Sequence, residues 1–135
     1  MKAHKISEFK LPLARLGGAR VPMSPGVYVL YRTNMGAAAW VGRHDNRLGE
    51  ALDQHRKRGI YSYFKYMVCA SADDAFEWEC MFWHQAQKTI DNNLMNGGKH
   101  PRLPLGSEVR CPFPGCTYVH EVESPVGVET EQENA

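Results

Sequence analysis

The segment that most constrains the fold is PGVYVLYRTNMGAAAWVG, residues 25–42. Two apolar runs flank RTNMG, whose Asn and Gly suit a hairpin loop. Each run carries a glycine and an aromatic residue in mirrored order, as GVY (26–28) and WVG (40–42). We therefore predict paired strands at 28–31 and 38–41, with glycine clearing space beside aromatic side chains that project toward a cleft.

A helix pattern follows this hairpin. Asp45 or Asn46 can cap a helix that runs to about Arg58, and Gly59 can end it. The residues before the hairpin, 1–24, indicate only a leader with a short turn.

A third strand and a second helix are predicted next. YSYFKYMVCA (61–70) is rich in aromatic and β-branched residues, as strands are. Ser71 and Asp74 form a capping-box pattern before a helix that extends to about Ile90. The segment after Asp91 is rich in Gly and Pro and is predicted to be irregular.

The second helix carries one apolar stripe that a carboxylate interrupts. The stripe consists of Ala75, Glu79, Phe82, Ala86 and Ile90, at helical spacing. Burial of a lone carboxylate is costly unless a cation or hydrogen-bond donors meet it. Glu79 is therefore either a site residue or lies at the edge of the stripe and reaches water.

Length and composition favour one domain without a membrane segment. The chain has 135 residues, of which 43% are hydrophobic. No signal peptide or membrane-spanning run is recognisable, so we expect a cytoplasmic protein that does not enter a membrane. We predict one α/β domain over 1–119, with its core at 24–116, and an acidic, disordered tail over 120–135.

Positive charge is concentrated in the middle of the chain. This basic set indicates a nucleic-acid-binding face, although an ordinary charged surface explains it about as well. Its members are Arg43, Arg47, Arg56, Lys57, Arg58 and Lys65.

The order of these motifs resembles the GIY-YIG nuclease superfamily. The two triplets stand at 26–28 and 40–42, and they are followed by DNRLGEALDQH, AFEWECMFWH and an Asn before HP. The closer likeness is to small bacterial or phage members with a paired-cysteine end. The resemblance implies a three-stranded antiparallel sheet flanked by helices, and metal-assisted hydrolysis of DNA phosphodiester bonds.

The resemblance also implies roles for individual residues. Tyr28 lies by the scissile phosphate and accepts a proton or orients the nucleophile. Glu79 binds Mg²⁺ or Mn²⁺, which tolerates one carboxylate with waters and phosphate as further ligands. His55 transfers a proton or contacts phosphate. Asn96 is the best match to the family's late Asn, with Asn92 and Asn93 as competitors.

Two departures from the family pattern leave activity open. Trp40 replaces the usual Tyr, and it keeps a ring and an N–H donor but cannot form a phenolate. Ala51 occupies the position of the family's Arg, by natural loss or by engineering, and loss of such a donor typically costs ~10²–10³ in rate. Arg47 and Arg43 are candidate substitutes.

Histidines and cysteines form a second constellation. Cys111 and Cys116 have the spacing C-x₄-C, and His100 precedes them by eleven residues. With His84 of the second helix they could hold one structural zinc ion that ties the irregular extension to the domain. Cys80 and His120 are alternative ligands. Free thiols with surface histidines explain the pattern about equally well.

Three functions therefore remain open. The first is a GIY-YIG endonuclease domain acting on branched or duplex DNA, active or inactivated by the alanine at position 51. The second is a non-catalytic module on the same fold that binds nucleic acid or protein. The third is a zinc-stabilised interaction domain with an accidental likeness to the family.

Overall fold

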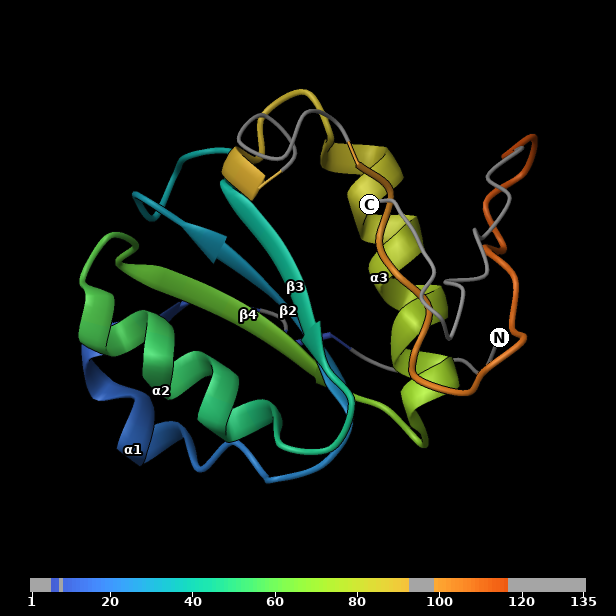
Figure 1. The fold of residues 1–135 in the computed structure, drawn as a ribbon. Helices are drawn as coiled ribbons and strands as arrows, with labels where there is room; N and C mark the ends of the chain where they lie inside the picture. The colour runs from blue at the N-terminus through green and yellow to red at the C-terminus, as the bar shows by residue number, and fades with distance from the viewer. Residues whose placement is uncertain (1–5, 8, 93–98, 117–135) are drawn as a thin grey trace.

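The fold is an antiparallel sheet with helices on both faces (Figure 1). The computed structural model describes residues 6, 7, 9–92 and 99–116. Its elements, in chain order, are β1 (Leu11–Pro12), η1 (Leu13–Arg15), α1 (Leu16–Ala19), β2 (Gly26–Tyr31), β3 (Trp40–His44), α2 (Leu48–Arg58), β4 (Tyr63–Val68) and α3 (Ala72–Ala86). The α/β class predicted from the sequence is confirmed.

The predicted number of strands is wrong, because the sheet has four strands in the order β1-β4-β2-β3. β1 pairs with β4 through Leu11 and Phe64. The expected leader thus contributes an edge strand. A strand of two residues is too short to show the alternation by which strands are recognised in a sequence.

The predicted hairpin is confirmed, with shifted ends. β2 and β3 pair antiparallel, and Tyr28 lies directly opposite Gly42. β3 begins at Trp40 rather than at residue 38 and continues to His44. Ala39 still donates its backbone N–H to Leu30 O at 2.8 Å.

The alternation of side chains along β2 builds two core layers. Tyr28 and Leu30 belong to a buried cluster with Leu48 and Leu52 of α2. Val27 packs with Ala75, and Val29 packs with Trp83 and Ile90, on the opposite face. Figure 1 shows α1 and α2 on one face of the sheet and α3 on the other.

The start of α2 differs from the prediction. Its N-cap is Arg47, and neither Asp45 nor Asn46 caps the helix. Instead, His44 Nδ1 accepts from the backbone N–H of Arg47 at 2.9 Å, while the Asp45 carboxylate pairs with Arg43. The predicted end is confirmed: Gly59 has φ 71° and donates to His55 O.

The start of α3 agrees with the prediction in part. The Ser71 hydroxyl accepts from Asp74 N–H, as predicted, but the Asp74 carboxylate accepts from Ala70 N–H rather than from Ser71. The helix ends at Ala86. Ile90 is fully buried beyond this end, so its place in the apolar stripe reflects core packing in a turn.

Residues 99–116 form no regular element and run beside α3 (Figure 1). His100 and Phe113 of this segment contact rings on α3. Asn93, Asn96, His120 and the predicted tail lie outside the described residues. None of the described helices has the length and apolar character needed to cross a membrane.

Candidate functional site

Three side chains predicted to be catalytic lie together, and we call them the Tyr28 group. The Tyr28 hydroxyl lies 3.1 Å from His55 Nε2. The Trp40 ring meets the His55 ring edge-on, with centroids 5.2 Å apart, and its indole N–H can only donate. β2, β3 and α2 each supply one member of this group.

Burial sets the protonation states in the Tyr28 group. Burial and the charge of Glu79 hold the pKa of Tyr28 well above its usual range, against the lowering effects of Trp40 and Arg58. Burial, assisted by Arg58, lowers the pKa of His55 to about 4. At neutral pH the pair is a phenol and a neutral imidazole. His55 Nδ1 is buried and has no hydrogen-bond partner among the described residues.

The glycines of the two triplets clear space for the protein's own side chains. A Cβ on Gly42 would lie 2.5 Å from Tyr28 Cζ and 2.5 Å from its hydroxyl oxygen. A Cβ on Gly26 would lie 2.5 Å from Leu48 Cδ2 and 2.6 Å from Met67 O. Gly42 therefore lets the Tyr28 ring lie flat across the edge strand, and Gly26 lets α2 approach β2.

Glu79 is paired with an arginine. Its Oε1 accepts from Arg43 Nη1 at 2.7 Å, and its side chain is 13% exposed. Asp45 accepts from Arg43 Nε at 2.7 Å. Burial raises the pKa of Glu79 to about 6, although Arg43 opposes this shift. The cation that makes this buried carboxylate tolerable is therefore Arg43, which lies on β3.

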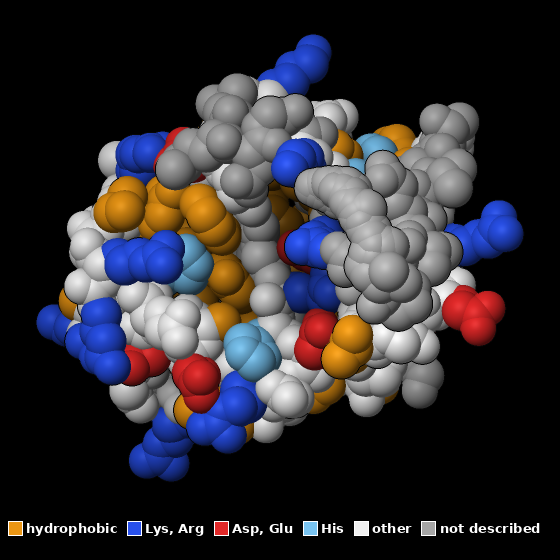
Figure 2. Space-filling model, in the orientation of Figure 1, with side chains coloured by type: hydrophobic (Ala, Val, Ile, Leu, Met, Phe, Trp, Pro, Cys, Tyr) orange, Lys and Arg blue, Asp and Glu red, His pale blue; other side chains and the backbone are white. Residues whose placement is uncertain are grey.

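The Tyr28 group and the Glu79 pair meet β3 at adjacent residues, which face opposite sides of the sheet. The Tyr28 ring covers Gly42, and the next residue, Arg43, binds Glu79. This face of the molecule is hollowed between α2 and α3, with a hydrophobic floor and Lys or Arg side chains on both sides (Figure 2). A shallow pocket at its α3 side is lined by Arg43, His44, Asp45, Asn46, Glu79 and Arg102.

Arg47 and Arg43, the candidate substitutes for the arginine expected at position 51, lie in different places. Ala51 is 8% exposed and packs in the core cluster of Tyr28 and Leu52. Arg47 is 54% exposed and pairs with Glu50 at the surface. Of the two substitutes, Arg43 is the one that reaches Glu79.

Asn92, one of the three candidates for the late Asn, closes the edge of the sheet. Its Nδ2 donates to Val41 O at 2.5 Å, and its Oδ1 accepts from Val41 N–H at 3.3 Å. The side-chain amide of Asn92 thus satisfies the backbone N–H and C=O of Val41 at the edge of β3 that no other strand pairs, so the role shown for Asn92 is structural.

The predicted nucleic-acid-binding residues do not share one surface. Arg56, Lys57 and Arg58 are exposed at the end of α2. Lys65 pairs in register with Val29 and belongs to the opposite face of the sheet. Arg43 is held in the Glu79 pocket.

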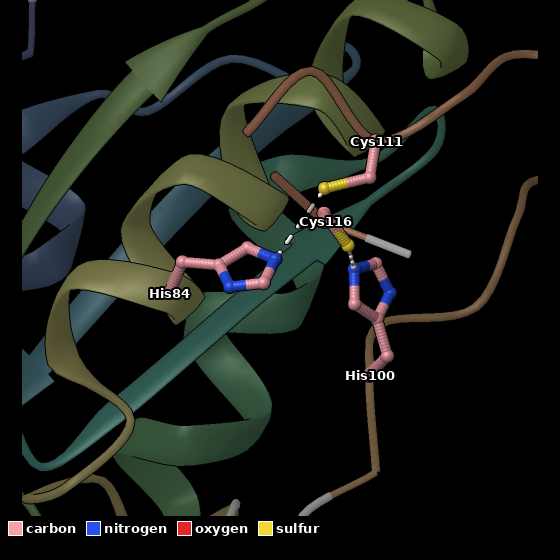
Figure 3. Close-up of side chains that lie close together, drawn as sticks. All are labelled: His84, His100, Cys111 and Cys116. Carbon is pink, nitrogen blue, oxygen red and sulfur yellow. Dashed lines mark hydrogen bonds between the residues drawn. The ribbon is translucent and has the colours of Figure 1, made fainter. Parts of the chain in front are cut away.

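The four predicted ligands of the second constellation do converge (Figure 3). His84 comes from α3, and His100, Cys111 and Cys116 come from the segment beside it. Their donor atoms all lie within 4.8 Å of one another, so the group could hold a metal ion. His84 Nε2 is 3.5 Å from Cys111 Sγ, and His100 Nε2 is 3.6 Å from Cys116 Sγ.

Neighbouring groups orient these ligands. His100 Nδ1 lies 2.9 Å from Pro101 O. A carbonyl can only accept, so Nδ1 carries the proton and the Nε2 lone pair is left to face Cys116. Phe113 stacks on His84 with ring centroids 4.1 Å apart. Burial lowers the pKa of His100, and that of His84 with a further contribution from His100, so both rings are neutral, as metal ligands must be.

Sequence reasoning missed Tyr61 and Arg102 as site residues, and it gave Arg58 only a nucleic-acid-binding role. Arg58 acts electrostatically on both Tyr28 and His55. Tyr61 is buried beside His55 and Trp40, with ring centroids 6.1 and 6.0 Å away. Arg102 lines the Glu79 pocket. Each residue had a signal in the sequence. Arg58 belongs to a run of basic residues at a helix end, Tyr61 ends a literal GIY at 59–61, and Arg102 follows His100 by two positions.

Comparisons with models of known protein families, with curated proteins and with solved structures found no match.

Proposed function

We propose that this chain is a metal-dependent DNA endonuclease domain of the GIY-YIG type. The observation that carries the proposal is the group of Trp40, Tyr28 and His55, which lies close enough to the Arg43–Glu79 pair for the charge of Glu79 to act on Tyr28. Groups that can relay a proton, next to groups that can bind a cation and a phosphate, are what phosphodiester hydrolysis requires.

In this proposal Tyr28 accepts a proton from the attacking water while its own proton passes to His55 Nε2. The Trp40 N–H would stabilise the partial negative charge that develops on the Tyr28 oxygen during this exchange, after which Tyr28 is again a phenol. The low pKa of His55, about 4, makes it a weak acceptor at neutral pH. Slow hydrolysis is therefore expected even apart from the lack of an arginine at position 51.

The oxygen donors around Glu79 suit a hard divalent cation, on the condition that the cation displaces Arg43. The carboxylates of Glu79 and Asp45 line one pocket and offer the oxygen ligands that Mg²⁺ or Mn²⁺ prefers. Both already bind Arg43, so a cation competes with its guanidinium. When bound there, the ion supplies positive charge for the phosphate and the leaving oxygen.

The test is nicking of supercoiled plasmid and cleavage of branched DNA in Mg²⁺ or Mn²⁺. We expect weak activity from the chain as it stands, and ~10²-fold more from Ala51→Arg. Tyr28→Phe and Glu79→Gln, each in the Ala51→Arg background, should abolish this gain. Glu50→Gln is the matched control, since Glu50 binds Arg47 at the exposed surface.

Two outcomes would count against this proposal. Cleavage that persists in Glu79→Gln would remove Glu79 from the site. If folded Ala51→Arg binds DNA but never cuts it, the second function, a non-catalytic nucleic-acid-binding module, is favoured. The packing of Ala51 in the core is the observation that favours this alternative, because a buried position must reorganise to admit an arginine.

We further propose that the ion at His84, His100, Cys111 and Cys116 is Zn²⁺ and that its role is structural. Two thiolates and two imidazoles form a closed tetrahedral set that zinc favours and that leaves no position for a substrate. The support is the convergence of all four donor atoms within 4.8 Å. Metal analysis of protein purified without added zinc should give one equivalent, and near-zero zinc would contradict this proposal.

A further inference from the structure

The Glu79 pocket contains one side chain from the segment that follows α3. Arg102 lines this pocket with Arg43 and Glu79, yet it belongs to the irregular segment 99–116. It stands two residues after His100, one of the four residues of the metal cluster. The same short stretch of chain thus enters both sites.

Arg43 alone is poorly suited to bind an anion in this pocket. Its Nε is bonded to Asp45 and its Nη1 to Glu79, both at 2.7 Å. A phosphate that approaches this group also meets two carboxylates. Arg102 adds a second guanidinium, and guanidinium groups match the geometry of phosphate oxygens.

The position of Arg102 depends on how segment 99–116 is held. Among the described residues, the backbone hydrogen bonds of this segment are local turns, from Ser107 to Pro104 and from Cys116 to Phe113. Contacts with α3 are made by side chains at the metal cluster, including Cys111 with His84 and Phe113 with His84. Among the described residues, these contacts consist of weak sulfur interactions and ring packing, which a metal ion would reinforce.

The two sites also share a side chain. Phe76 of α3 lies 6.4 Å from the His100 ring, between centroids, and its ring centroid is 5.3 Å from Arg43 Cζ. Glu79 and Cys80 are consecutive on α3, and Cys80 interacts with Cys111. The cluster and the pocket are therefore next to each other along one helix.

From this arrangement we propose that the metal centre assembles a phosphate-binding site. The bound ion fixes His100, which places Arg102 beside Arg43 at Glu79, where both arginines bind one phosphate of the nucleic acid. Arg102 thereby supplies the cation that position 51 lacks. The inference rests on the proposed nucleic-acid function, but it concerns binding and is independent of cleavage.

The test compares Arg102→Ala with Arg110→Ala, using a fluorescent duplex DNA at several salt concentrations and zinc-loaded full-length protein. Arg110 is the matched control, because it is exposed on the same segment and does not line the pocket. Arg102→Ala should weaken binding about tenfold and reduce the salt slope by about 1. Arg110→Ala should change neither quantity by as much.

Coupling to the metal is tested by a double-mutant cycle. Cys111→Ser, Cys116→Ser should weaken DNA binding about tenfold when Arg102 is present and have little further effect in Arg102→Ala. Loss of protein stability alone would act equally in both backgrounds. If the serine variant does not fold, the comparison of Arg102→Ala with Arg110→Ala still decides the role of Arg102.

The outcomes separate this inference from the proposed function. Equal binding by Arg102→Ala and Arg110→Ala, with DNA still bound, would overturn the inference and leave the nuclease proposal standing. If the serine and Arg102 substitutions weaken DNA binding independently of each other, the proposal that the metal positions Arg102 would be overturned. Absence of any DNA binding at low salt would overturn the inference together with the nucleic-acid function.

Discussion

At the scale of single residues, the position of the Tyr28 ring depends on the glycine at position 42. Tyr28 and Gly42 are direct partners across the β2–β3 ladder, and the Tyr28 ring occupies the volume where a Cβ of residue 42 would be. This contact turns the Tyr28 hydroxyl toward His55. A glycine on an edge strand, which by itself weakens a sheet, is here covered by an aromatic ring.

Gly42→Ala should therefore displace Tyr28. The added Cβ would lie 2.5 Å from two Tyr28 atoms, so we expect a loss of about 1–3 kcal/mol in the free energy of unfolding. The measurement is urea unfolding, with Gly17→Ala as the control because nothing lies within 4 Å of a Cβ there. A Gly42→Ala variant as stable as Gly17→Ala would show that the ring is free to move.

His55 should make the fold sensitive to acid. Its folded-state pKa of about 4 is below the unfolded value of 6.5, so between these pH values the unfolded chain binds a proton that the folded chain does not. Stability is lost as pH falls through this window, by roughly 2–3 kcal/mol at pH 4.5. Glu79, whose pKa is raised to about 6, acts in the opposite direction.

The contribution of His55 can be isolated by urea unfolding at pH 7 and pH 4.5. His55→Asn should lose less stability between these pH values than the original chain, by the same roughly 2–3 kcal/mol, while the Glu79 contribution cancels in the comparison. Identical losses would mean that His55 titrates in the folded protein as it does in the unfolded chain.

At the scale of elements, α3 serves two sites along its length. Glu79 and His84 are five positions apart on this helix. Glu79 bonds to Arg43 of β3, whereas His84 faces Cys111 of the segment outside. The helix therefore joins the sheet to a segment that has no regular backbone pairing of its own within the described residues.

Removal of the metal ligands should loosen that segment and spare the sheet. We expect Cys111→Ser, Cys116→Ser to lose its zinc and to lower the thermal midpoint, because the metal ties 99–116 to α3. Hydrogen exchange should accelerate in 99–116 while amides of β2 and β4 keep their protection. Unchanged zinc content and exchange would reduce the cluster to thiols and histidines that happen to be close.

At the scale of the whole molecule, positive charge lies on both sides of the hollow between α2 and α3 (Figure 2). The exposed end of α2 contributes Arg56, Lys57 and Arg58. Arg56 and Lys57 share the carboxylate of Asp53. Exposed pairs of this kind are weak, so they exchange readily for phosphate contacts.

DNA binding should therefore depend on α2 and on salt. Alanine at Arg56, Lys57 and Arg58 should reduce the slope of log affinity against log salt by about 3, since each neutralised phosphate releases counterions. Lys65→Ala should leave the slope almost unchanged, because Lys65 lies on β4, which β2 separates from the edge strand β3, and belongs to the face of the sheet opposite α2. Equal effects of the two changes would place the binding surface elsewhere.

The sequence by itself determined the features that depend on local pattern. The hairpin, the helix end at Gly59 and the apolar stripe of α3 follow from alternation and helical spacing, and residue chemistry singled out the four side chains that could hold a metal ion. These signals are visible because each is repeated or tightly spaced along the chain. The two-residue strand β1 carries no such repeat, and it was missed.

Only the tertiary structure decided which groups meet. Arg43 bonds to Glu79 across 36 positions of sequence, and Arg102 enters the same pocket from a segment without periodicity. The sequence left open whether Glu79 is a site residue or reaches water, and it did not identify Arg43 as its partner. Such pairings depend on strand register, helix placement and side-chain reach acting together, and burial then fixes the protonation of Tyr28 and His55.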